Sequence, residues 1–91
     1  MDLSHILEYE MEIKARYIEL IVMAYRDMQN QVTADLTNYV IQILSVDGIL
    51  HLRFSNPNAP SRFPFVSREY PILNYQIDIE SGKIIRITGE R

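Results

Sequence analysis

The sequence predicts an α+β fold in which one long N-terminal helix packs on a four-stranded antiparallel β-meander. Three observations favour this class. Residues 3–29 contain neither Gly nor Pro and repeat apolar residues at helical spacing. An Asp-Gly pair at 47–48 separates two apolar stretches, and a second pair of such stretches flanks Gly82. The 91 residues fit a single domain, 1–91, and leave no room for a second core.

The helix is expected over residues 3–29. One face of its helical wheel gathers Leu3, Ile6, Leu7, Ile13, Tyr17, Leu20, Ile21, Ala24 and Met28. Four more apolar residues widen the arc beyond one stripe: Met11, Ile18, Val22 and Tyr25. At about 1.5 Å per residue the helix would run about 40 Å, whereas four strands make a sheet only about 19 Å wide. We therefore expect a second copy to cover these four residues in a homo-oligomer, with a dimer favoured.

Residues 39–55 predict the first hairpin, because the Asp-Gly pair at 47–48 favours a two-residue type I′ turn. This turn sets the register of both faces. The core face pairs Ser45 with Leu50, Ile43 with Leu52 and Ile41 with Phe54. The other face pairs Val46 with Ile49, Leu44 with His51 and Gln42 with Arg53. This second face is half apolar, so it too has room for a cover.

Residues 71–89 predict the second hairpin. The segment Glu80-Ser81-Gly82 suits a three-residue turn in which Gly82 is left-handed and forms a bulge. The core face would then gather Leu73, Tyr75, Ile77, Ile79, Ile85 and Ile87. The pairs Gln76/Arg86 and Asn74/Thr88 would lie on a solvated face.

Composition and charge exclude several classes of function. The net charge of −3 lacks the basic footprint of a general nucleic-acid binder. The absence of cysteine excludes disulfides, thiolate zinc sites and cysteine nucleophiles, and it fits a cytoplasmic protein. The start of the chain carries acids where a signal peptide needs basic residues, and the longest apolar run, LIVMAY, is too short to span a membrane.

The sequence offers little for catalysis. There is no glycine-rich phosphate loop and no G-x-S-x-G elbow. His5 and His51 lie far apart, and neither has metal-ligand spacing around it. We therefore expect no enzyme activity, no metal and no cofactor.

The link between the hairpins, residues 56–70, is the best candidate for a binding segment. It belongs to a stretch, 55–71, that holds all four prolines of the chain, and a loop longer than about 12 residues is usually functional or disordered. Three interpretations stay open: the aromatic residues plug the core, the loop contacts another protein, or arginines converge on an anion with an aromatic ring stacked on a base. The candidate binding residues are Arg53, Arg62, Phe63, Phe65, Arg68 and Tyr70.

Taken together, these features predict a small, non-catalytic binding or regulatory protein of the adaptor or inhibitor type. We expect it to act as a homo-oligomer through contacts with a protein partner. The alternative is a protein that binds a small anionic ligand, such as a nucleotide or a phosphate metabolite, through the loop arginines and aromatic residues.

Overall fold

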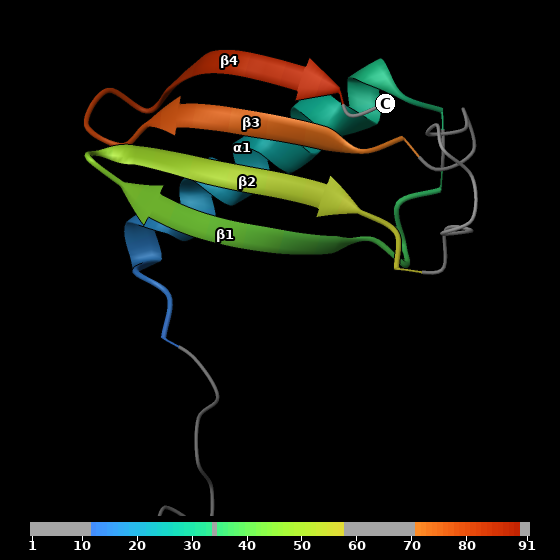
Figure 1. Cartoon of the computed structure of the whole chain (residues 1–91), viewed down its shortest axis with the longest axis horizontal. Coiled ribbons are helices and arrows are strands. Elements are labelled where there is room, and N and C mark those ends of the chain that lie inside the picture. The colour runs from blue at the N-terminus through green and yellow to red at the C-terminus, as the bar shows by residue number, and fades with distance from the viewer. Residues whose placement is uncertain (1–11, 34, 58–70, 90–91) are drawn as a thin grey trace, which may run out of the picture.

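The computed structural model describes residues 12–33, 35–57 and 71–89. They form one helix, α1 (Ala15–Gln31), and four strands, β1 (Val40–Val46), β2 (Ile49–Ser55), β3 (Leu73–Asp78) and β4 (Lys83–Gly89). The strands make one antiparallel sheet in the order β1-β2-β3-β4. The helix α1 crosses one face of this sheet diagonally (Figure 1). The predicted α+β class, with its meander, is confirmed.

The helix begins later than predicted. Its first residue is Ala15; Lys14 has an extended backbone with φ −62° and ψ 137°, and Glu12 and Ile13 are not helical either. The rest of the expected N-terminal part, residues 3–11, lies outside the described residues. Helices in proteins are stabilised mainly by packing of their apolar face. In Figure 1 residues 12–14 lead away from the sheet, so these three residues have no strand to pack against.

The described helix is shorter than the helix from which a second copy was expected. A helix of 17 residues is about 26 Å long. Its N-terminal end is anchored at the end of the sheet, where Nη2 of Arg16 donates a hydrogen bond to the Ile79 carbonyl at 3.2 Å. The described helix is therefore shorter than expected, and the rest of the expected overhang falls on residues 3–11, outside the described residues.

The first hairpin follows its predicted register. Asp47 and Gly48 both have positive φ, 51° and 77°, as a type I′ turn requires. Every pair predicted for the two faces occurs between β1 and β2. The N–H of Ile79 donates to the Gly48 carbonyl at 3.0 Å, which ties this turn to the β3–β4 turn.

The second hairpin differs from its predicted register at one point. Gly82 is left-handed as expected, with φ 73°, but Asp78 pairs with Lys83, so the turn takes in Ile79 as well. A β-bulge then pairs Ile77 with Ile84, while the pairs Gln76–Arg86 and Asn74–Thr88 keep the predicted register. The prediction that Ile85 lies on the core face is wrong: Ile85 is 55% exposed, and Ile84 packs against the core instead.

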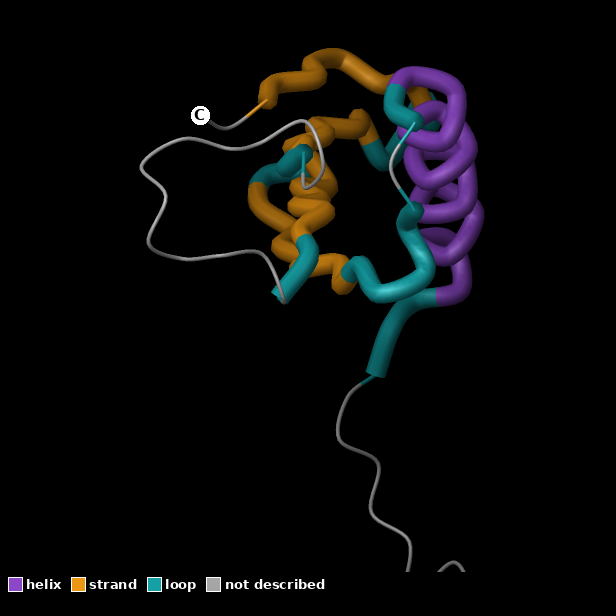
Figure 2. The backbone as a smooth tube through the Cα atoms, turned by 90° about the vertical axis from the view of Figure 1, so that its right-hand side faces the viewer, coloured by secondary structure: helices purple, strands orange, loops and turns teal. Residues whose placement is uncertain are grey.

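The core lies between α1 and the sheet (Figure 2). Its buried residues are Leu20, Ala24, Met28, Leu36, Leu50, Leu52, Phe54, Tyr75 and Ile77. The rings of Phe54 and Tyr75 meet edge to face with centroids 5.5 Å apart. β2 and β3 bury alternate residues toward α1, so the residues between these, and those that pair with them on β1 and β4, lie on the side away from α1. No helix in the described part of the chain is long and apolar enough to cross a membrane.

Candidate functional site

The face of the sheet opposite α1 is the candidate site, and no described helix or strand covers it (Figures 1 and 2). We call it the open face. Its residues follow from the strand register and from the burial of their neighbours on the helix side. They are Val40, Gln42, Leu44, Val46, Ile49, His51, Arg53, Ser55, Asn74, Gln76, Asp78, Lys83, Arg86 and Thr88.

The register arranges most of these side chains in three rows that run across all four strands. The first row is Gln42, Arg53, Asn74 and Thr88. The second row is Leu44, His51, Gln76 and Arg86. The third row is Val46, Ile49, Asp78 and Lys83. Directly opposed side chains in a sheet have Cβ atoms about 4.5–5.5 Å apart, so the members of a row are close enough to bind one ligand together.

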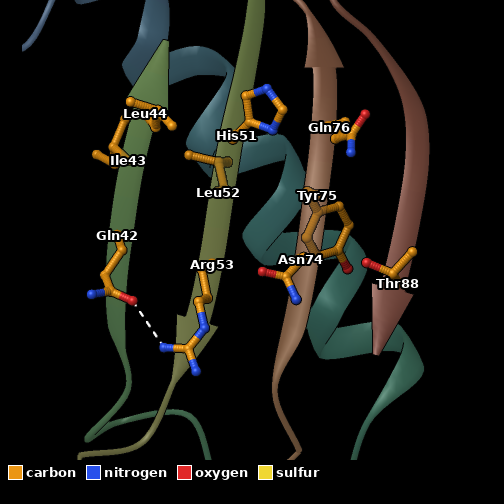
Figure 3. Close-up of a pocket in the computed structure, with 10 residues that line it drawn as sticks. All are labelled: Gln42, Ile43, Leu44, His51, Leu52, Arg53, Asn74, Tyr75, Gln76 and Thr88. Atoms are coloured by element: carbon orange, nitrogen blue, oxygen red, sulfur yellow. Dashed lines mark hydrogen bonds between the residues drawn. The ribbon is translucent and has the colours of Figure 1, made fainter. Parts of the chain in front are cut away.

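A hollow of about 380 Å³ lies over the first two rows (Figure 3). Residues from all four strands line it: Gln42, Ile43, Leu44, His51, Leu52, Arg53, Asn74, Tyr75, Gln76 and Thr88. Its volume falls in the range of about 300–1,000 Å³ typical of ligand sites. Amide, imidazole, guanidinium and hydroxyl groups lie in this lining beside a larger apolar area, so the hollow offers a ligand both hydrogen bonds and apolar contact.

Of the candidate binding residues, Arg53 alone falls within the described part of the chain, and the structure places it in the hollow. Its Nη1 donates to Oε1 of Gln42 at 2.9 Å and to Oγ of Ser55 at 3.5 Å, which orients the guanidinium along β2 (Figure 3). The other candidates lie outside the described residues; they are Arg62, Phe63, Phe65, Arg68 and Tyr70. The three interpretations of the 56–70 loop therefore stay predictions.

The structure describes three of the four residues expected at an oligomer interface. Ile18 and Val22 are exposed on the helix, at 48% and 41%. Tyr25 is half-buried and packs against the core, so part of its apolar surface is already covered within the chain. Met11 lies outside the described residues.

The structure adds exposed apolar residues that were not among the candidates. Val40, Leu44 and Val46 are 44%, 60% and 42% exposed on the open face. The hairpin register already assigned Leu44 and Val46 to a half-apolar face, and this was the signal that could have marked them as candidates.

The open face is locally basic although the chain carries a net charge of −3. Its described residues include the cations Arg53, Lys83 and Arg86 and one acid, Asp78. Hydrogen bonds from the side chain and backbone of Ser81 hold the pKa of the Asp78 carboxyl below its usual range. Asp78 therefore stays ionised at neutral pH and leaves an excess of positive charge on this face.

The side chains of the site are mainly hydrogen-bonding and apolar groups. Among the described residues, no group of three His, Cys, Asp or Glu side chains is arranged to hold a metal ion. Of the side chains that line the hollow, His51 supplies the imidazole, which can donate or accept a hydrogen bond. The remaining groups can accept or donate hydrogen bonds to a ligand without a change in their charge at neutral pH.

The fold and the site define a class: a small α+β chain with one helix layer and a basic, partly apolar sheet face that can receive a ligand. Comparison of the chain with protein-family models, with curated proteins and with solved structures gives no match. No relative therefore assigns a role to any residue of this chain.

Proposed function

We propose that this protein is a non-catalytic binding protein, of the adaptor or inhibitor type, that recognises another protein through its open face and acts as a homo-oligomer. The observation that carries the proposal is the group of exposed apolar residues on that face, with Leu44 at 60% exposure. Apolar surface left in water costs about 25 cal/mol per Å². Clustered apolar residues rimmed by polar groups are typical of interaction sites.

The charges of the open face define the chemistry of the partner. The guanidinium groups of Arg53 and Arg86 and the ammonium group of Lys83 lie on one face with a single carboxylate, Asp78. A guanidinium binds a carboxylate through two parallel hydrogen bonds. The partner surface should therefore present acidic side chains next to apolar ones, with the apolar groups seated over Leu44 and its neighbours near the β1–β2 turn.

Selection from a random peptide library tests this proposal with a defined probe. We expect peptides selected on the wild-type protein to combine Asp or Glu with large apolar residues. Addition of a selected peptide should change NMR chemical shifts in the rows of the open face. L44D should raise the Kd of that peptide by at least about tenfold. The matched control is I18D, which introduces the same charge at an exposed position of α1 and should leave the Kd unchanged.

Two results would contradict the proposal. Selected peptides that are rich in Lys and Arg would show that the charge argument is wrong. Shift changes confined to α1, with binding lost in I18D and kept in L44D, would place the protein contact on the helix.

A second candidate function is supported by the hollow itself. Its volume of about 380 Å³ and the guanidinium of Arg53 fit a small anion such as a nucleotide. Inorganic phosphate and a panel of nucleotides would then raise the melting temperature of the wild-type protein but not that of R53Q. If no compound in the panel shifts the wild-type transition, this second function is ruled out for those ligands.

A further inference from the structure

In the part of the chain that the structure describes, the sheet edge formed by β1 lacks the features that normally protect an edge strand. Its sequence, VIQILSV, contains no charged residue, no Pro and no Gly. Natural proteins protect edge strands with Lys, Pro, bulges or short length, because exposed backbone groups otherwise pair with another chain. Every residue of β1 except Ile41 is exposed. The strand therefore has the properties of one that receives a further strand.

The opposite edge, β4, is protected. It carries Lys83 and Arg86, and its pairing with β3 is interrupted by the bulge near Ile84. Charges and bulges both discourage the addition of a strand. Pairing of β1 with β4 of the next copy would build an open-ended fibre, whereas pairing of β1 with β1 closes after two copies. The difference between the two edges favours the closed arrangement.

The hairpin geometry defines which backbone groups of β1 are available. The two-residue turn makes Val46 and Ile49 a hydrogen-bonded pair. Antiparallel pairs alternate, so the N–H and C=O groups of Leu44, Gln42 and Val40 also face β2. Those of the three residues between them, Ser45, Ile43 and Ile41, face away from the sheet.

These outward groups are self-complementary in one antiparallel register. If Ile43 of one copy faces Ile43 of a second copy, then Ile41 faces Ser45 and Ser45 faces Ile41. Each outward N–H and C=O then has a partner. An antiparallel pair of identical strands centred on one residue has two-fold symmetry, which is the symmetry of most homodimers.

We propose that two copies of this chain join through their β1 edges, centred on Ile43, to form one continuous sheet. This inference deepens the proposed function, which expects a homo-oligomer, and moves the interface from the helix to the sheet edge. Four of the large apolar residues exposed in the described chain lie in β1: Val40, Ile43, Leu44 and Val46. The pairing places Ile43 against Ile43 on the helix side, and it places Val40 beside Val46 on the open face.

The same pairing joins the two binding surfaces. Gln42 of one copy becomes the neighbour of Leu44 of the other, so the first row of one open face continues into the second row of the next. Both residues line the hollow. A partner protein would then contact both copies across the seam, and the site of one chain would be incomplete without the other.

Residue-resolved hydrogen exchange on the full wild-type chain, with sedimentation over a concentration series, tests the inference. We expect a dimer at micromolar concentration in which the amides of Ile41, Ile43 and Ser45 are protected, and we expect this protection to be lost on dilution. I43K should raise the dimer Kd by at least about tenfold, because it places two like charges directly opposite each other. I85K adds the same charge at an exposed residue of β4 and should leave the Kd unchanged.

A monomer across the whole concentration range would overturn the inference. A dimer in which the amides of Ile41, Ile43 and Ser45 exchange freely would also overturn the inference. That dimer would use another surface, such as the exposed side of α1 with Ile18 and Val22. The exchange measurement uses the wild-type chain and does not depend on whether I43K folds. Peptide binding at the open face of a monomer would leave the proposed recognition of another protein standing while removing this interface and the homo-oligomer. A β1-linked dimer that selects no peptide would do the reverse.

Discussion

The side chain of Tyr75 joins the two layers of the molecule. Its ring is fully buried and meets Phe54 edge to face, while its hydroxyl donates to Oδ2 of Asp27 on α1 at 2.8 Å. Asp27 also accepts a hydrogen bond from Gln31, so its carboxylate is held on the helix surface. Burial, together with the neighbouring carboxylate of Asp27, raises the pKa of the Tyr75 phenol far above its usual value.

This raised pKa predicts that the protein loses stability at alkaline pH. In the unfolded chain Tyr75 ionises near pH 10, whereas in the folded chain it stays protonated well above that pH. The folded state therefore binds more protons than the unfolded state above about pH 10, and the free energy of unfolding falls as pH rises. Urea denaturation followed by circular dichroism between neutral pH and alkaline pH measures this slope. Burial also raises the pKa of Tyr39, which adds to the effect.

Substitution of Tyr75 by Phe tests the contribution of this single hydroxyl. Y75F should cost about 1 kcal/mol at neutral pH, because it removes one hydrogen bond between the layers. It should also reduce the alkaline slope, and the remaining slope should come from Tyr39. The control is Y17F, which removes an exposed hydrogen bond to Oγ of Ser45 and should change stability by less than about 0.5 kcal/mol. An alkaline slope of equal size in wild type and Y75F would contradict this account.

At the scale of the elements, the bulge in β4 decides which of two adjacent isoleucines supports the core. Ile84 pairs with Ile77 and packs against the core, whereas Ile85 is 55% exposed. I84A should therefore cost about 1–2 kcal/mol, less than truncation of a fully buried isoleucine. I85A should stay within about 0.5 kcal/mol of the wild type. Urea denaturation of both variants measures the difference, and a larger loss for I85A would indicate the uninterrupted register.

The two hairpins also show what the sequence could and could not predict. The Asp-Gly turn specifies a two-residue loop, so the whole register of β1 and β2 followed from it. In the second hairpin two isoleucines follow one another at 84–85, and alternation alone cannot tell which one faces the core when a bulge is present. The start of α1 was misplaced because apolar residues keep helical spacing as far back as Leu3, while the sheet that supports the helix ends near Arg16.

The candidate site was predicted only in part, for a related reason. Turn chemistry fixes the register of the first hairpin and, outside the bulge, most of the second, but β2 and β3 are joined through the long 56–70 segment, whose length sets no register. The rows of the open face depend on that central pairing, in which Arg53 faces Asn74 and His51 faces Gln76. Arg53 could be named as a candidate from the sequence. The other residues of the first two rows could be identified only once the pairing of β2 with β3 was known.

At the scale of the whole molecule, the two faces of the sheet have different roles. The face toward α1 holds the buried residues that stabilise the fold, and the open face carries the exposed apolar and basic groups. Leu52 and Leu44 illustrate the separation, since they are the same residue type on neighbouring strands but are 1% and 60% exposed. The two residues lie close together in the sheet, but we expect Leu52 to stabilise the fold and Leu44 to contact a partner.

This separation predicts opposite effects for two identical truncations. L52A should lower the free energy of unfolding by about 2–5 kcal/mol, because it leaves a cavity in the core. L44A should change it by less than about 0.5 kcal/mol but should weaken binding of a selected peptide, since it removes an apolar contact from the open face. Dilute protein should be used for the unfolding measurement, so that association between copies does not add to the stability. If L44A destabilises the dilute chain as much as L52A does, then the open face is covered by the chain itself, and a partner would have no surface there to bind.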